Sequence, residues 1–281
     1  MTYFGFLLRF LVPPIVALAL VAAWDARRGR RLPADLGLLN PWLVLVLHAA
    51  AAVIWTTPWD NYLVATRVWW YDPGLVSGII LGWVPLEEYL FFVLETLLTG
   101  LWLLVLAVRM APPAQPFDPA RRAARLARWG GTAIAAALFL LGAAILAFGY
   151  RPATYLALTL VWIAPPILLQ TAFGGDILWH HRKLVLAALL PAWLYLCVAD
   201  FVAIGLGTWI IAPDQAVGLG VGHLPLEEIV FFLATNVVLT FGMVLMLARA
   251  SGSRAPGFLR TWVGPATVPS GKGAGDLSTR Q

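Results

Sequence analysis

Cysteine and charge are both scarce in this 281-residue sequence. The single cysteine, Cys197, excludes an internal disulfide and any Cys-rich zinc or iron–sulfur site. Charged residues make up only 12% of the chain, about half the share that is usual in soluble domains. This shortage excludes an ordinary soluble protein, a coiled coil and a disordered chain. The net charge of +5 is better explained by cationic loops at a membrane surface than by binding to nucleic acid. We expect no nucleic-acid partner.

Several functional signatures are also missing. The only lysines, Lys183 and Lys272, lie outside the apolar runs, so a retinal-binding protein with a lysine inside a span is excluded. The aspartates are isolated, which argues against a magnesium-diphosphate site. No Gly-rich nucleotide loop and no local signature of a serine or cysteine nucleophile is evident. His180-His181 lies in a cationic segment without an obvious carboxylate partner, so the sequence predicts no metal site.

Apolar residues dominate what remains. They form 61% of the chain, which has 14 tryptophans and a mean hydropathy of +0.83. A bilayer core needs about 20 apolar residues per helix, and seven segments qualify. We therefore predict an all-α, polytopic membrane protein with seven transmembrane helices, near 3–23, 38–56, 85–108, 131–148, 154–172, 184–200 and 225–247. Two shorter, Gly-rich stretches, 73–84 and 205–222, are predicted to be re-entrant or interfacial.

The cationic residues predict the orientation. Of the 19 Lys and Arg, 16 fall in alternate connections or in the tail, on one side of the membrane. By the positive-inside rule we expect a multi-pass protein of the cell membrane with its N-terminus outside and its C-terminus in the cytoplasm. The tail from Ser251 is rich in Gly, Ser, Pro and charge, which predicts a disordered appendage.

An internal repeat is the strongest signal in the sequence. At an offset of 140 residues, the tetrapeptide at 85–88, Pro-Leu-Glu-Glu, recurs at 225–228. The same offset, without a gap, also pairs Asp60 with Asp200, Trp69 with Trp209, Pro73 with Pro213, Gly78 with Gly218, Gly82 with Gly222, and Phe91-Phe92 with Phe231-Phe232.

The repeat predicts the domain plan. Three spans reverse the direction of the chain, so one extra helix is needed before a second copy can insert in the same orientation. We expect two parallel three-helix repeats joined by one linker helix. The units are the first repeat at 1–110, the linker at 111–150, the second repeat at 151–250 and the tail at 251–281.

The repeated carboxylates are the candidate catalytic residues. Acids in the first turn of a helix are favoured by the helix dipole, so helix-end stabilisation is the simpler explanation of each pair. However, ionisable groups retained near the hydrocarbon tend to face a cavity or a site. Glu95 shares a helix face with Glu88 and lies about two turns further into the span, where it could be a proton donor or make an interhelical hydrogen bond. The candidate acids are Glu87, Glu88, Glu227, Glu228, Glu95, Asp60 and Asp200.

Aromatic side chains accompany these acids. They could form an interfacial belt, or their ring faces could stabilise a carbocation. His223 is a secondary candidate, because on a helix it would reach Glu227, more simply as a structural partner. The candidate substrate-binding residues are Trp69, Trp70, Phe91, Phe92, Trp209, Phe231, Phe232 and His223.

The duplicated Pro-Leu-Glu-Glu motif, Asp60-Asn61-Tyr62, Trp69-Trp70-Tyr71 and the arrangement of spans resemble the lycopene cyclase domain family of integral-membrane enzymes. The resemblance covers most of 38–108 and 178–247. It implies proton-initiated, non-redox cyclisation of the ends of lycopene to β-ionone rings, giving γ-carotene and β-carotene, with an apolar carotenoid substrate in lipid. Other enzymes of the carotenoid pathway are conceivable partners. The flavin of unrelated cyclases has no binding motif here, so we expect no cofactor.

Three alternatives stay open at this point. Similar enzymes act on fifty-carbon carotenoids or form ε-rings. A small membrane transporter can also have a plan of three, one and three helices. The sequence leaves undecided which glutamate donates the proton, and whether the halves form one composite site or two.

Overall fold

The computed structural model describes residues 1–254, and seven helices there are long and apolar enough to cross a membrane. The first span combines α1 (Tyr3–Phe6), a π-helical turn (Leu7–Leu11) and α2 (Val12–Arg27). The others are α3 (Pro41–Ala65), α4 (Leu86–Arg109), α5 (Arg122–Ala147), α6 (Thr154–His180), α7 (Arg182–Gly205) and α8 (Leu226–Leu247). The predicted all-α membrane fold with seven spans is confirmed.

The two helices that carry Asp60 and Asp200 extend past their predicted ends. We placed these ends at 56 and 200, where the apolar runs stop, whereas α3 reaches Ala65 and α7 reaches Gly205. The acids Asp60 and Asp200 therefore lie within these helices and are completely buried, at 1% and 0% exposure. Neither is solvated at a helix end.

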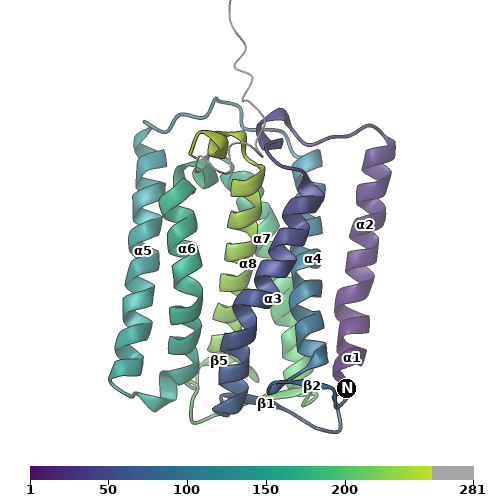
Figure 1. Cartoon of the computed structure of the whole chain (residues 1–281), viewed down its shortest axis with the longest axis vertical. Helices are drawn as coiled ribbons and strands as arrows, with labels where there is room; N and C mark the ends of the chain where they lie inside the picture. The colour runs from purple at the N-terminus through teal and green to yellow at the C-terminus, as the bar shows by residue number, and fades with distance from the viewer. Residues whose placement is uncertain (255–281) are drawn as a thin grey trace, which may run out of the picture.

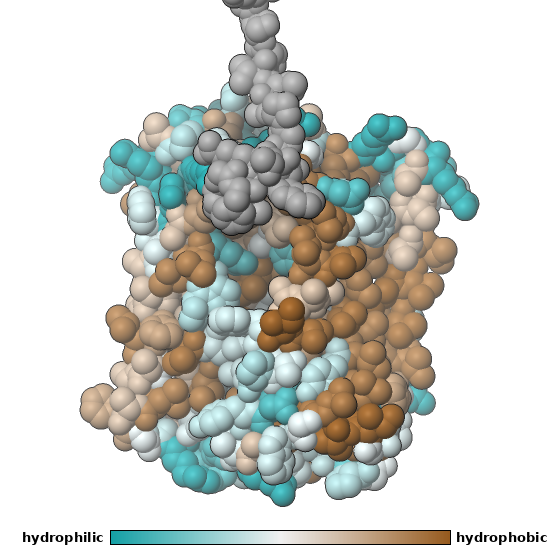
Figure 2. Space-filling view, viewed as in Figure 1, coloured by the Kyte–Doolittle hydropathy of each residue, from teal (hydrophilic) through white to brown (hydrophobic). Residues whose placement is uncertain are grey.

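The helices stand side by side as a bundle (Figure 1). The central pair, α4 and α8, packs against helices on both sides, whereas α5 packs mainly against α6 at the edge. The N-terminus lies at the end of the bundle that carries the short strands. In Figure 2, apolar side chains cover much of the right-hand side and parts of the left edge of the visible face, a paler band runs down its centre, and the strongest hydrophilic colour lies mainly toward the two ends, the pattern expected of a bilayer-spanning surface.

The stretches at 73–84 and 206–222 are not helical. They contain two small hairpins, one of β2 (Ile80–Leu81) with β3 (Val84–Pro85) and one of β5 (Gly220–Val221) with β6 (Leu224–Pro225). Gly82 and Gly222 turn the chain with φ of +71° and +60°, a region that glycine adopts without strain. The strands were not foreseen from the sequence.

A third strand pair joins the two halves of the chain. β1 (Trp69–Tyr71) runs antiparallel to β4 (Trp209–Ile211), with Trp70 opposite Ile210 at the centre. Since these two residues are repeat counterparts, a two-fold axis through the centre of this strand pair relates the halves. The axis agrees with the predicted parallel repeats.

Equivalent backbone hydrogen bonds occur in the two halves of the chain. Leu86 donates to Ile79, and Leu226 donates to Leu219. Likewise, Tyr3 donates to the carbonyl of Leu75, and Tyr155 donates to that of Gln215. The last two bonds show that the first span corresponds to α6.

The chain remains ordered a few residues past α8. A 3₁₀ segment, Arg249–Arg254, follows, and both guanidinium NH groups of Arg254 bond to the buried carboxylate of Asp176, at 2.7 and 2.5 Å. This bond raises the pKa of Arg254 further. The disorder predicted from Ser251 is therefore wrong for residues 251–254, and the rest of the predicted tail lies outside the described residues.

Candidate active site

Glu88 and Glu228 occupy equivalent buried positions in the first turns of α4 and α8. Oε2 of Glu88 accepts hydrogen bonds from the hydroxyls of Tyr3, at 2.6 Å, and Tyr71, at 2.9 Å. Oε1 of Glu228 accepts one from Tyr155, at 2.8 Å. The Pro of each motif is the N-cap that precedes the helix, and these tyrosine contacts place the second glutamate of each pair inside the bundle.

Asp60 and Asp200 complete a group of four acids with these glutamates. Trp209 donates its indole N–H to Asp200 at 2.9 Å. Trp69 stands beside Asp60 in the equivalent place, but no hydrogen bond of normal geometry from the described part of the chain reaches either Asp60 oxygen. Electrostatic interactions connect each aspartate to the glutamate of its own repeat and connect Glu88 to both acids of the other repeat. We call Asp60, Glu88, Asp200 and Glu228 the acid cluster.

The acid cluster has no cationic partner among residues 1–254, since none of the ion pairs found there involves its members. Burying four unpaired carboxylates would be very costly. Some of the four must therefore hold protons, and proton transfer is the chemistry that such a group performs readily.

The first glutamate of each pair has a different position. Glu87 accepts hydrogen bonds from the backbone N–H and the hydroxyl of Ser77, and Glu227 accepts one from the backbone N–H of Val217 at 2.7 Å. Both carboxylates anchor the segment that leads into the adjacent hairpin. Neither lines the cavity beside the acid cluster, although the sequence grouped all four glutamates together.

Aromatic rings surround this cavity. Trp69 packs edge-on against Tyr155, with ring centroids 5.2 Å apart, and Trp209 packs against Tyr3 at 5.1 Å. Burial, and then the charges of Asp60 and Glu88, raise the pKa of Tyr71 well above 10, so this hydroxyl remains a donor. Among the predicted aromatic residues, the cavity wall includes Trp69, Phe91, Trp209, Phe231 and Phe232.

The other predicted binding residues lie elsewhere. Trp70 is partly buried in the strand pair, outside the cavity wall. His223 is exposed in the β5–β6 turn, where its ring packs against Phe201 with centroids 3.9 Å apart and bonds to that residue's carbonyl. Because this segment is not helical, the expected approach to Glu227 is wrong.

A second, larger cavity of about 390 Å³ lies between α3 and α6. Glu95 and Phe92 of α4 line it together with Thr235 and Phe231 of α8. Oε1 of Glu95 accepts a hydrogen bond from the Thr235 hydroxyl at 2.7 Å. Phe231 lines both cavities, so the two are neighbours.

Tyr3 and Tyr155 are the site residues that sequence reasoning missed. Their spacing is 152 residues, whereas the Pro-Leu-Glu-Glu motifs are 140 apart, so a search at one offset does not align them. Pro13-Pro14 and Pro165-Pro166 are also 152 residues apart. This second offset was the sequence signal that could have aligned the two tyrosines.

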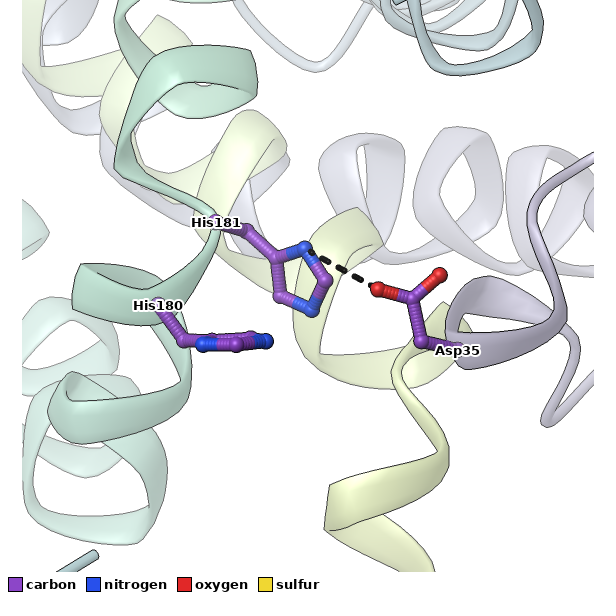
Figure 3. Close-up of side chains that lie close together, drawn as sticks. All are labelled: Asp35, His180 and His181. Carbon is purple, nitrogen blue, oxygen red and sulfur yellow. Dashed lines mark ion pairs between the residues drawn. The ribbon is translucent and has the colours of Figure 1, made fainter. Parts of the chain in front are cut away.

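The predicted lack of a carboxylate near His180 and His181 is wrong. At the opposite end of the bundle, Oδ2 of Asp35 lies 4.0 Å from Nδ1 of His181 (Figure 3). These three residues offer ligand atoms within 4.8 Å of one another. Burial lowers the pKa of His181 to about 4, so its ring is neutral at pH 7. The adjoining cavity is also lined by Arg121, Arg182 and Lys183, whose charges oppose a bound cation. The group is better explained as structural.

Buried acids, aromatic walls and a membrane-embedded apolar cavity together define an acid–base enzyme for an apolar substrate. Sequence comparison agrees. Lycopene β-cyclase of Halobacterium salinarum is 41% identical over 254 residues, which cover 88% of this chain and 98% of that protein. The bifunctional lycopene cyclase/phytoene synthases of Arthroderma gypseum and Phaeosphaeria nodorum are 33% and 36% identical over 77% and 73% of this chain, but over only 38% and 36% of their own lengths.

The chain belongs to the lycopene cyclase family. No family model matches the sequence, and no solved structure matches the chain.

Proposed function

We propose that this protein is a membrane-embedded lycopene β-cyclase, which closes the linear ends of lycopene into β-ionone rings. The observation that carries this function is the group of buried carboxyls, unpaired with any cation of residues 1–254, beside aromatic rings and an apolar cavity. The relative of nearly equal length is named a lycopene β-cyclase, which favours β-rings over the ε-ring and fifty-carbon alternatives.

The reaction needs one proton to enter and one to leave. A carboxyl protonates C2 of the terminal C1=C2 double bond and leaves a tertiary cation at C1. The electrons of the C5=C6 double bond then form the C1–C6 bond, which moves the cation to C5. Loss of the C6 proton to a carboxylate restores the double bond. The product is an isomer of the substrate, so the cycle requires no oxidant or reductant.

The residues of the site supply what this sequence of steps requires. Carboxyls that hold protons inside the bilayer can act as general acids. Negative charge remaining in the acid cluster and the faces of the surrounding rings stabilise a cation. Apolar walls keep water from capturing that cation.

The surroundings of the enzyme follow from the same proposal. The substrate is wholly apolar and reaches the protein from membrane lipid. The end of the bundle that carries Glu88 and the strands faces outward, and the opposite end, with its many arginines, faces the cytoplasm. The domain boundaries given above, with a linker built around α5, remain predictions.

Expression in a bacterium that accumulates lycopene, followed by pigment chromatography, tests the function directly. Conversion of lycopene to γ-carotene and β-carotene is expected. Unchanged lycopene, with the protein present in the membrane, would contradict the proposal. Sugar uptake into liposomes tests the transporter alternative, which no observation here favours.

A further inference from the structure

The cavity between α3 and α6 is open to the lipid side of the bundle. In Figure 1, α3 crosses in front of α8 and diverges from α6 toward the end opposite the N-terminus. Trp55 on α3 and Leu169 on α6 line the cavity, yet they are 49% and 68% exposed on the outer surface. An apolar molecule dissolved in the bilayer can enter between these helices without crossing water.

The volumes of the two cavities decide where a substrate end can lie. The space beside the acid cluster is about 40 Å³, room for about three water molecules at 10–15 Å³ each. The cavity between α3 and α6, at about 390 Å³, falls in the range of small-molecule sites, roughly 300–1,000 Å³. Only the second accommodates a branched hydrocarbon end without rearrangement of the surrounding helices.

The second cavity is also elongated. Its lining runs along α3 from Thr56 to His48, eight residues apart, or about 12 Å at 1.5 Å per residue. Glu95 and Thr235 lie toward the end with Thr56, while Gln170 lies beside His48, since both approach Gly242. A long space with an acid near one end suits an extended polyene.

Among residues 1–254, Glu95 is the one acid that lines this cavity. Its Oε1 bonds to Thr235, and that is the only hydrogen bond to the carboxyl from residues 1–254. The carboxyl is therefore fixed at one oxygen and free at the other to act on a bound molecule.

We propose that the cavity between α3 and α6 binds the linear end of the carotenoid and that Glu95 is the catalytic residue that protonates it. This inference rests on the proposed function and names the site within it. Glu95 gives its proton to C2, and the carboxylate so formed takes the proton released from C6, so the residue ends the cycle as it began. The acid cluster then acts from the neighbouring cavity through its charge.

The assignment makes the two repeats unequal. The counterpart of Glu95 is Thr235, that of Trp55 is Tyr195 and that of Gln170 is Leu18. Tyr195 donates its hydroxyl to the carbonyl of Phe10 at 2.7 Å, which ties α7 to the first span on the equivalent side. One substrate end is therefore processed per chain at a time, and a bicyclic product requires the molecule to leave and return reversed.

The test uses the full-length protein in the lycopene-accumulating bacterium, with two readouts: cyclised pigment and the amount of lycopene that purifies with the protein. Glu95→Gln keeps the shape but removes the donor, so we expect at least a 100-fold loss of cyclisation with lycopene still bound. Ala52→Trp fills the cavity from α3 and should abolish both bound lycopene and cyclisation. Ala50→Trp is the matched control on the same helix, exposed and outside the lining, and should behave as the wild type.

The outcomes separate this inference from the function itself. Normal cyclisation by Glu95→Gln would overturn the donor assignment and leave the lycopene cyclase function intact. Normal binding and cyclisation by Ala52→Trp would overturn the cavity assignment. If that variant does not accumulate, Leu169→Trp fills the same opening from α6 and is judged by the same criterion. Absence of cyclised product from the wild type would instead contradict the proposed function.

Discussion

The hydroxyl of Tyr3 lies 2.6 Å from Oε2 of Glu88, across the interface between the first span and α4. Tyr155 repeats the contact with Glu228. Each tyrosine is a positioning residue that holds a carboxyl by one short bond inside the bundle. Glu88 has a second such bond from Tyr71, whose counterpart is Ile211, so within residues 1–254 Glu228 is held by Tyr155 alone.

Replacement of Tyr155 by Phe should therefore lower the rate of cyclisation more than replacement of Tyr3 by Phe. We expect Tyr155→Phe to lower kcat by about 10-fold or more, the effect of losing one hydrogen bond to a charged group, with KM nearly unchanged. Tyr3→Phe should have a smaller effect, because Tyr71 still holds Glu88. Tyr195→Phe, which also loses a hydroxyl bond but outside the site, is the control. Steady-state rates with lycopene in liposomes measure the difference, and equal effects at Tyr3, Tyr155 and Tyr195 would count against the positioning role.

The two glutamates of each motif should respond differently to substitution. Glu88→Gln and Glu228→Gln each remove an ionisable carboxyl from the acid cluster and should lower kcat by about 100-fold while the protein level is maintained. Glu87→Ala removes the anchor of the segment at Ser77, so it should lower stability by about 1.5–3 kcal/mol per lost bond to a charged group. Thermal unfolding of the purified protein and pigment yield per molecule separate the two effects. Full activity in both Gln variants would mean that the acid cluster only stabilises helix ends.

The source of the new hydrogen can be read from the product. Because a carboxyl supplies it, rings formed in deuterated water should carry deuterium at C2, up to one atom per ring. Label below one atom per ring would measure how often Glu95 passes a C6 proton to the next substrate before exchange with solvent. Mass spectrometry of the isolated carotenes gives the value. Unlabelled rings after many turnovers, together with label transferred from a deuterated nicotinamide or flavin, would exclude the acid mechanism.

The orientation of the bundle predicts the location of its connections. Gly29, between α2 and α3, should face the cytoplasm, and Gly74, between β1 and β2, should face outward. Reporter domains inserted at the two glycines should therefore give opposite signals. Detection of both on one side of the membrane would contradict the seven-span arrangement, and exchange of the two sides would contradict only the orientation.

The sequence specified the helices and the repeat because both leave periodic or duplicated traces. Glu88 and Glu228 were found since their motif is copied without a gap. The burial of Asp60 and Asp200 was not foreseen, because hydropathy falls at Thr56-Thr57 while backbone hydrogen bonds carry α3 onward to Ala65. The contact between Tyr3 and Glu88 was also missed, since it joins residues 85 apart and depends on tertiary packing.

The pairing of β1 with β4 also could not be predicted from local sequence, because it depends on residues far apart in the chain. Trp69–Tyr71 gains its backbone partners from residues 209–211, so no neighbouring segment signals the pairing. The lateral cavity with Glu95 likewise arises from the divergence of α3 and α6, which is a property of helix packing. In the sequence, the only indication of this cavity was the position of Glu95 deep within a predicted span.

The strand pair β1–β4 also sets an order of events during synthesis. When Trp69–Tyr71 leaves the ribosome, about 140 residues must still be made before β4 exists. At roughly 5–20 residues per second this takes on the order of 10 s. The first repeat thus enters the bilayer with its outer edge unpaired, and the four acids come together only after the last helix has been inserted. Proton chemistry in the membrane is thereby withheld until α8, which carries Glu228, has been made.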